Sequence, residues 1–120
     1  MKKGLWWFGV AVFVGSVGLV AGQSDGELEV FFVDVEGGQA TLIVSPSGES
    51  LLIDSGFPGE RDAERIASAA RDAGVSQIDY HMITHLHADH LGSTPVLATK
   101  MPILNFVDVG EPHEPSRGGR

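Results

Sequence analysis

The nine residues THLHADHLG, Thr84–Gly92, determine how this chain is interpreted. They continue a short run, residues 78–84, that predicts a buried strand, and they precede a helix signal at residues 94–100. In open α/β sheets, ligands bind beyond the carboxyl ends of the strands. The stretch therefore stands where a binding site is expected.

The stretch places three histidines and an acid within six positions. Alternate side chains of an extended chain point the same way, so His85, His87 and Asp89 are expected on one side. A turn just before His90 would bring that ring beside them. A divalent cation would satisfy all four groups at once, since imidazole suits zinc or iron and a carboxylate also suits manganese. The alternative is a solvated histidine-rich loop, but the full string is more specific than a lone pair of histidines.

The segments around this stretch predict an α/β protein with a mixed sheet. A turn at residues 45–48 between two apolar runs predicts an antiparallel hairpin. A strand that follows a helix is expected to join the sheet in parallel. The expected strands are residues 27–35, 40–44, 51–53, 78–84 and 103–109, and the expected helices are residues 62–73 and 94–100.

The first predicted helix has one apolar face. Its apolar residues recur at three- and four-residue steps: Ala63, Ile66, Ala69, Ala70 and Ala73. Its charged residues are interpreted as a solvated face: Glu60, Asp62, Glu64, Arg65 and Arg71. Gly74 is a natural stop.

The composition excludes several classes of protein. The chain has 120 residues, 8 basic and 16 acidic, and a formal net charge of −8, which argues against a strong nucleic-acid-binding surface. It has no cysteine, so disulfides, thiolate metal sites and a cysteine nucleophile are excluded. About a hundred residues beyond the N-terminal segment suggest one domain at most. No pattern indicates an oligomeric state.

The first 24 residues are expected to be a secretory signal. Lys2 and Lys3 precede an apolar run, and Val20-Ala21-Gly22 offers small residues for cleavage. The alternative is a retained membrane anchor at residues 4–22, close to the length a spanning helix needs. In both cases the remainder would be exported to the periplasm or outside the cell, with membrane contact only through this segment.

At this point the sequence resembles a family, the metallo-β-lactamase-fold metallohydrolases. Thr84–Gly92 resembles their metal-binding signature, and residues 51–56, LLIDSG, resemble their strand-Asp-Ser/Thr-Gly element. More weakly, residues 32–38 are similar to the opening strand of the hydrolase domain of bacterial DNA-uptake channel proteins. That branch typically reads D-V-G-Q-G-D, whereas this chain has Glu36 in place of a glycine and Gln39 in place of the last acid.

The resemblance implies roles for individual residues. His85 and His87 would bind a first metal ion, and Asp89 and His90 a second. With one ion present, Asp89 would instead act as the catalytic base that manages a proton of water. Asp54 would orient the histidine loop through hydrogen bonds, or, in the alternative, merely stabilise a turn. The hydroxyl of Thr84 would brace the loop. The cofactor would be one or two Zn²⁺ ions, with iron or manganese as alternatives.

The family fold is a four-layer αββα sandwich built from two halves, and this chain matches only the N-terminal half. We therefore expect an incomplete domain at residues 25–110, a flexible tail at residues 111–120, and an origin in a longer product. The implied function is hydrolysis of a small-molecule or phosphodiester substrate, with lactam, ester and thioester also open. The alternatives are a non-catalytic metal-binding half-domain or a truncated relic.

Three further expectations follow from the residues. His81 should be a hydrogen-bonded core histidine rather than a ligand, and His113 an exposed tail residue. The apolar strands require cover on both faces, yet only two helices are predicted. An apolar sheet face should therefore be exposed.

Overall fold

The computed structural model describes residues 26–110, so the expected signal or anchor and the expected tail lie outside the described residues. Within that range the elements are β1 (Glu29–Phe32), β2 (Thr41–Val44), β3 (Ser50–Ile53), α1 (Glu60–Asp72), β4 (Ile78–Met82), α2 (Ala88–Leu91), α3 (Thr94–Lys100) and β5 (Ile103–Val107). No helix between residues 26 and 110 is long and apolar enough to cross a membrane.

The strands form one mixed sheet in the order β1-β2-β3-β4-β5. The first three strands are antiparallel neighbours, whereas β4 lies parallel to both β3 and β5. The hairpin between β2 and β3 closes where the Gly48 amide donates to the Ser45 carbonyl at 2.8 Å. The predicted mixed α/β sheet, hairpin and parallel crossover are confirmed.

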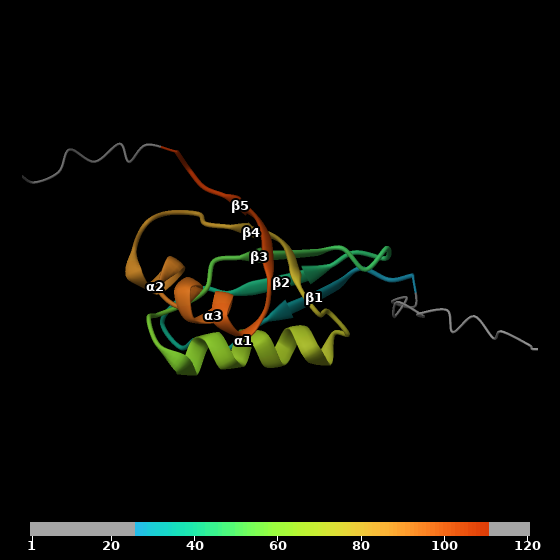
Figure 1. Ribbon diagram of the computed structural model, residues 1–120, viewed down its shortest axis with the longest axis horizontal. Coiled ribbons are helices and arrows are strands. Elements are labelled where there is room, and N and C mark those ends of the chain that lie inside the picture. The colour runs from blue at the N-terminus through green and yellow to red at the C-terminus, as the bar shows by residue number, and fades with distance from the viewer. Residues whose placement is uncertain (1–25, 111–120) are drawn as a thin grey trace, which may run out of the picture.

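The core lies between the sheet and the helices, with α1 and α3 on the same side of the sheet (Figure 1). The sheet contributes Leu42, Val44 and Leu52, each 0–2% exposed, and α1 contributes Ala63, Ile66, Ala67 and Ala70. Of the apolar face predicted for this helix, Ala63, Ile66 and Ala70 are buried, whereas Ala69 and Ala73 are only partly buried. Burying such side chains contributes roughly 25 cal/mol for each Å² of apolar surface.

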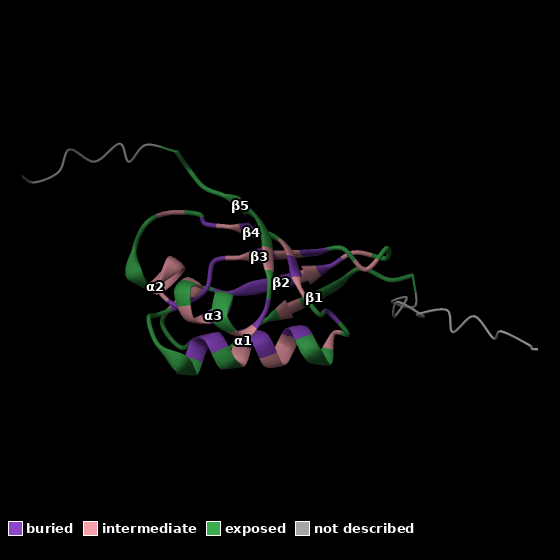
Figure 2. Cartoon of the chain, in the orientation of Figure 1, coloured by how far each residue is buried: buried purple, intermediate pink, exposed green. Residues whose placement is uncertain are grey.

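The opposite face of the sheet carries apolar side chains that no described helix covers. The register aligns Val30, Ile43, Leu51 and Tyr80 in one row across four strands. Val30 is 45% exposed and Tyr80 42%, and Phe32 in β1 is 83% exposed. Figure 2 also shows that β5, at the edge of the sheet, is largely exposed. The expected exposed apolar face is confirmed.

The structure corrects several local predictions. β1 ends at Phe32 instead of residue 35, because the chain then turns through Glu36, which has a positive φ of 58°. Asp62 is not on the solvated face of α1: it is 2% exposed, and its carboxylate accepts the Phe57 amide at 2.8 Å. Helix α3 spans Thr94–Lys100, so the predicted bounds of this helix are confirmed.

Candidate metal centre

The histidine loop connects β4 to α3, and the structure brings three of its predicted ligands together. One ligand atom each from His85, His87 and Asp89 lies within 4.8 Å of the others. The rings of His85 and His87 are nearly perpendicular, with centroids 4.7 Å apart. His87 is exposed, whereas His85 and Asp89 are partly buried. The trio therefore converges at a position that solvent can reach.

His90 lies beside this trio. The short helix α2 provides the expected turn, and the His90 ring centroid lies 3.8 Å from that of His85. Its Nε2 atom is 3.6 Å from Oδ2 of Asp89. Asp89 thus lies beside the other two members of the trio, His85 and His87, and also beside His90.

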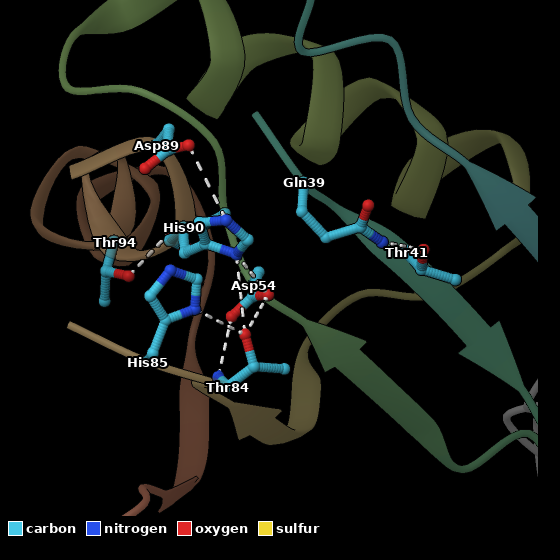
Figure 3. Close-up of polar contacts among 9 residues, drawn as sticks. Gln39, Thr41, Asp54, Thr84, His85, Asp89, His90 and Thr94 are labelled. Carbon is cyan, nitrogen blue, oxygen red and sulfur yellow. Dashed lines mark hydrogen bonds and ion pairs between the residues drawn. The ribbon is translucent and has the colours of Figure 1, made fainter. Parts of the chain in front are cut away.

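Asp54 connects the histidine loop to the end of β3. It follows β3 with a positive φ of 57° and is fully buried. Its carboxylate accepts the Thr84 amide at 2.8 Å, the Thr84 hydroxyl at 2.7 Å and His90 Nδ1 at 2.8 Å (Figure 3). Burial alone would raise the pKa of Asp54, but the hydrogen bonds from His90 and Thr84 outweigh it and hold that pKa below its usual range.

These hydrogen bonds fix which ring nitrogens carry protons. An ionised carboxylate only accepts, so His90 must donate from Nδ1 and keep Nε2 toward Asp89. The Thr84 hydroxyl spends its single proton on Asp54, so its oxygen accepts from His85 Nδ1 at 3.2 Å. Nε2 of His85 is then unprotonated in the neutral ring. Asp54 thus contacts the His90 ring directly and the His85 ring through Thr84.

The sheet explains why residues 30 positions apart meet. β3 and β4 are parallel neighbours, so their carboxyl ends reach the same edge. The Asp54 amide donates to the Met82 carbonyl at 2.8 Å, which extends the ladder by one step. Thr84 therefore emerges beside Asp54. The metal-binding and orienting roles of these residues stay predictions, but the structure places all of them at one edge.

Several supporting residues were not singled out from the sequence. Ser55 is fully buried; its hydroxyl lies 2.9 Å from that of Thr94, and its amide donates to the His90 carbonyl. The Ser93 hydroxyl donates to the Ser55 carbonyl. The sequence marks Ser55 only as part of the Asp-Ser-Gly element and assigns it no contact, so these contacts required the fold.

His81 lies in the core, as expected, with no exposed surface. The expectation that it is hydrogen-bonded is wrong: neither ring nitrogen has a partner among the described residues. Its ring packs against Phe106 of β5, with centroids 5.7 Å apart. It faces the helices in the same row as Leu52, whose side chain cannot accept or donate.

The donor set suits a divalent transition metal. Two imidazoles and a carboxylate are the nitrogen and oxygen ligands that zinc accepts at catalytic sites, with a further position for water or substrate. The trio and His90 would supply both imidazole and carboxylate to one ion or to two. The residues present therefore fit a metal.

Comparison with known proteins points the same way. The family model described as the metallo-beta-lactamase superfamily matches residues 33–120. A UPF0173 metal-dependent hydrolase of Cupriavidus metallidurans is 35% identical over 93 residues, which cover 73% of this chain and 29% of that protein. A UPF0173 metal-dependent hydrolase of Cupriavidus necator is 31% identical over 94 residues, 76% of this chain and 31% of that protein.

A third relative is named for a different activity. An atrochrysone carboxyl ACP thioesterase of Aspergillus terreus is 34% identical over 68 residues, 57% of this chain and 21% of that protein. The chain thus spans less than a third of the length of these curated relatives. No solved structure matches the chain.

Proposed function

The chain belongs to the metallo-beta-lactamase superfamily, and we propose on that premise that its histidine loop holds a divalent cation for hydrolysis. One observation carries this proposal: ligand atoms of His85, His87 and Asp89 lie within 4.8 Å of one another at the carboxyl edge of the sheet. The names of the UPF0173 relatives support a metal-dependent hydrolase.

We propose zinc as the metal, with iron or manganese as alternatives. His85 and His87 would hold one ion, and Asp89 and His90 a second. When bound, such a cation lowers the pKa of water to about 7 and polarises the substrate oxygen that gains negative charge. With a single ion bound, Asp89, which lies beside His85, His87 and His90, would instead hold and move the proton of an attacking water. Asp54 and Thr84 keep the rings oriented.

The substrate is proposed to be a small molecule or phosphodiester with an electrophilic carbonyl or phosphorus centre. The thioesterase relative supports including thioesters beside esters and lactams. The net charge of −8 disfavours a long nucleic acid, because phosphate contacts need basic side chains. Export, with either a cleaved signal or a retained anchor, remains our proposal for the compartment.

A second candidate is a non-catalytic metal-binding domain. Two observations favour it: the match spans less than a third of the relatives, and one apolar sheet face is uncovered by the described residues. In that case catalysis by a complete enzyme would need further ligands and a cover for this face.

Metal titration tests the proposal. The chelator-treated chain is titrated with Zn²⁺ by calorimetry, beside His85→Ala, His87→Ala and, as a matched control, His113→Ala outside the loop. We expect the two loop variants to lose more than the roughly 10- to 100-fold in affinity typical of losing a ligand's hydrogen-bond partner. The control should bind like the wild type. Equal affinities in all four proteins would refute the metal site.

Turnover then separates the two candidates. Zinc-loaded wild type is assayed with bis(p-nitrophenyl) phosphate and with a chromogenic lactam. Hydrolysis that disappears in His85→Ala supports the enzyme. Tight metal binding without turnover of either substrate supports the non-catalytic domain.

A further inference from the structure

The loop between β1 and β2 approaches the histidine loop through its main chain at Gly38. A Cβ atom added at Gly38 would lie 2.5 Å from the Asp89 carbonyl oxygen and 3.4 Å from the Asp89 carbonyl carbon. It would also lie 3.1 Å from the Gly56 Cα. All three are main-chain atoms, which cannot rotate away as a flexible side chain can. Only glycine therefore fits at position 38, between the histidine loop and the loop after β3.

Hydrogen bonds fix the same contact. The Gln39 amide donates to the Asp89 carbonyl at 3.1 Å, and the Gly56 amide donates to the Gln39 carbonyl at 2.8 Å. The Gln39 side chain takes no part in this contact, because its Nε2 atom donates to the Thr41 hydroxyl at 2.8 Å (Figure 3). The main chain of Gln39 thus connects the Asp89 loop to the loop after β3.

The far side of this segment is attached to α1. Glu36 forms an ion pair with Arg61 at 2.8 Å, and Arg65 donates to the Asp34 carbonyl at 2.7 Å. Exposed ion pairs contribute little individually. Here they act together with the bond from the Val33 amide to the Ala40 carbonyl, at 3.0 Å, which closes the base of the loop. The segment therefore has little room to retreat from Asp89.

We propose that Gly38 and Gln39 are positioning residues that set the main chain of Asp89, and through it the carboxylate that faces the metal. The inference rests on the proposed metal site. A side chain at position 38 would push the Asp89 carbonyl outward, break its bond to the Gln39 amide and move Asp89 away from His85 and His87. The loss in the free energy of Zn²⁺ binding should exceed the loss in the free energy of unfolding.

Gly37 provides a matched control. A Cβ added there would meet only a Phe57 ring atom, at 3.9 Å, which is ordinary contact. Neither Gly37 nor Gly38 has the positive φ that would strain alanine. Gly37→Ala and Gly38→Ala therefore change the chain chemistry equally, and only Gly38→Ala introduces the clash.

Two measurements test the proposal. In the metal-free protein, Gly38→Ala should shift the backbone NMR resonances of residues 87–91, whereas Gly37→Ala should leave them near wild type. In Zn²⁺ titrations, Gly38→Ala should bind about 10- to 100-fold more weakly than Gly37→Ala, the range found when a ligand's supporting contacts are lost. A purely structural role would lower the melting temperature without this difference in affinity.

Unshifted resonances, or equal affinities of the two variants, would overturn the proposal. If Gly38→Ala does not fold, hydrogen exchange in the wild type decides. Zn²⁺ should slow exchange of the Gln39 amide and leave unchanged that of Gly48, which bonds to Ser45 in the distant hairpin. No slowing at Gln39 refutes it. A wild type that binds no metal refutes the proposed function, and in that case resonance shifts in metal-free Gly38→Ala still reveal the contact with Asp89.

Discussion

Replacing His81 with leucine should make the protein more stable. The side chain has no exposed surface, and neither ring nitrogen has a hydrogen-bond partner among the described residues. A neutral imidazole carries one donor and one acceptor, and each buried unsatisfied group costs about 1–3 kcal/mol. Leucine has a similar volume and no polar atom, so removing both groups in His81→Leu should raise the free energy of unfolding by about 2–6 kcal/mol at pH 8.

The same residue should make stability depend on pH. Burial lowers the pKa of His81 from its ordinary value of 6.5 to about 4, and the negative charge of Asp54, together with the polar main chain of that residue, offsets only part of this effect. Below pH 6.5 the unfolded chain gains a proton at this position that the folded chain does not, so stability falls as the pH falls from 6.5 toward 4. The difference between these pKa values corresponds to about 3 kcal/mol in the free energy of unfolding. This stability is fully present above pH 6.5 and is lost as the pH falls to about 4.

Urea unfolding followed by circular dichroism measures both effects. Wild type, His81→Leu and the exposed-histidine control His87→Leu are compared from pH 8 to pH 4 in chelator, so that metal binding does not contribute. Other acidic groups titrate in all three proteins and cancel in the differences. Between these pH values the wild type and the control should lose about 3 kcal/mol more than His81→Leu. Parallel profiles, or a variant less stable than wild type at pH 8, would refute the reasoning.

Three other substitutions have defined outcomes. Asp54→Asn should cost about 1–3 kcal/mol in urea unfolding, because an amide nitrogen would face the Thr84 and His90 donors. The pKa of Asp54 is lowered in the folded protein, so its charge stabilises the fold above its ordinary pKa of 3.8. The stability difference between wild type and Asp54→Asn should therefore shrink as the pH falls through the folded pKa. A difference that stays constant with pH would contradict this. Phe32 is 83% exposed on the open sheet face, so Phe32→Thr should change the free energy of unfolding by less than about 0.5 kcal/mol. The same substitution should reduce the fluorescence of a bound apolar dye, and unchanged dye binding would argue against an exposed apolar sheet face. Gly74→Ala should cost about 1 kcal/mol in thermal unfolding, because Gly74 ends α1 with a φ of 72°, and an unchanged melting temperature would contradict the assigned helix end.

The sheet was predictable from local signals because its strands are bounded by strong turns. Ser45–Gly48 between two apolar runs indicated the hairpin, and a strand after a helix indicated the parallel crossover. The limits of β1 were less predictable. The β-forming residues run on to Val35, but the chain leaves the sheet after Phe32 to bring Gly38 against Asp89. A contact between segments 51 residues apart leaves no trace in local propensity.

Buried polar residues were the main errors. Helical spacing placed Asp62 on the solvated face, yet its carboxylate turns back to the Phe57 amide and to Arg61 Nε, at 2.7 Å. The burial of His81 followed from its strand, but the lack of a partner did not. A periodic pattern indicates which face a residue occupies. It does not indicate whether a polar atom on that face finds a donor or acceptor.

The convergence of Asp54 and Thr84 follows from the predicted topology more directly than from any motif. Parallel neighbouring strands end at the same edge of a sheet, and the pairing of Ile53 with Met82 sets the step. One residue beyond Ile53 is Asp54, and two beyond Met82 is Thr84, whose amide and hydroxyl both reach the Asp54 carboxylate. Slipping this pairing by one residue would turn the Asp54 side chain to the opposite face of the sheet. Core contacts of residues such as Leu52 hold this strand register. The register therefore decides whether the Asp54 carboxylate lies beside the histidine loop, where it accepts hydrogen bonds from Thr84 and His90.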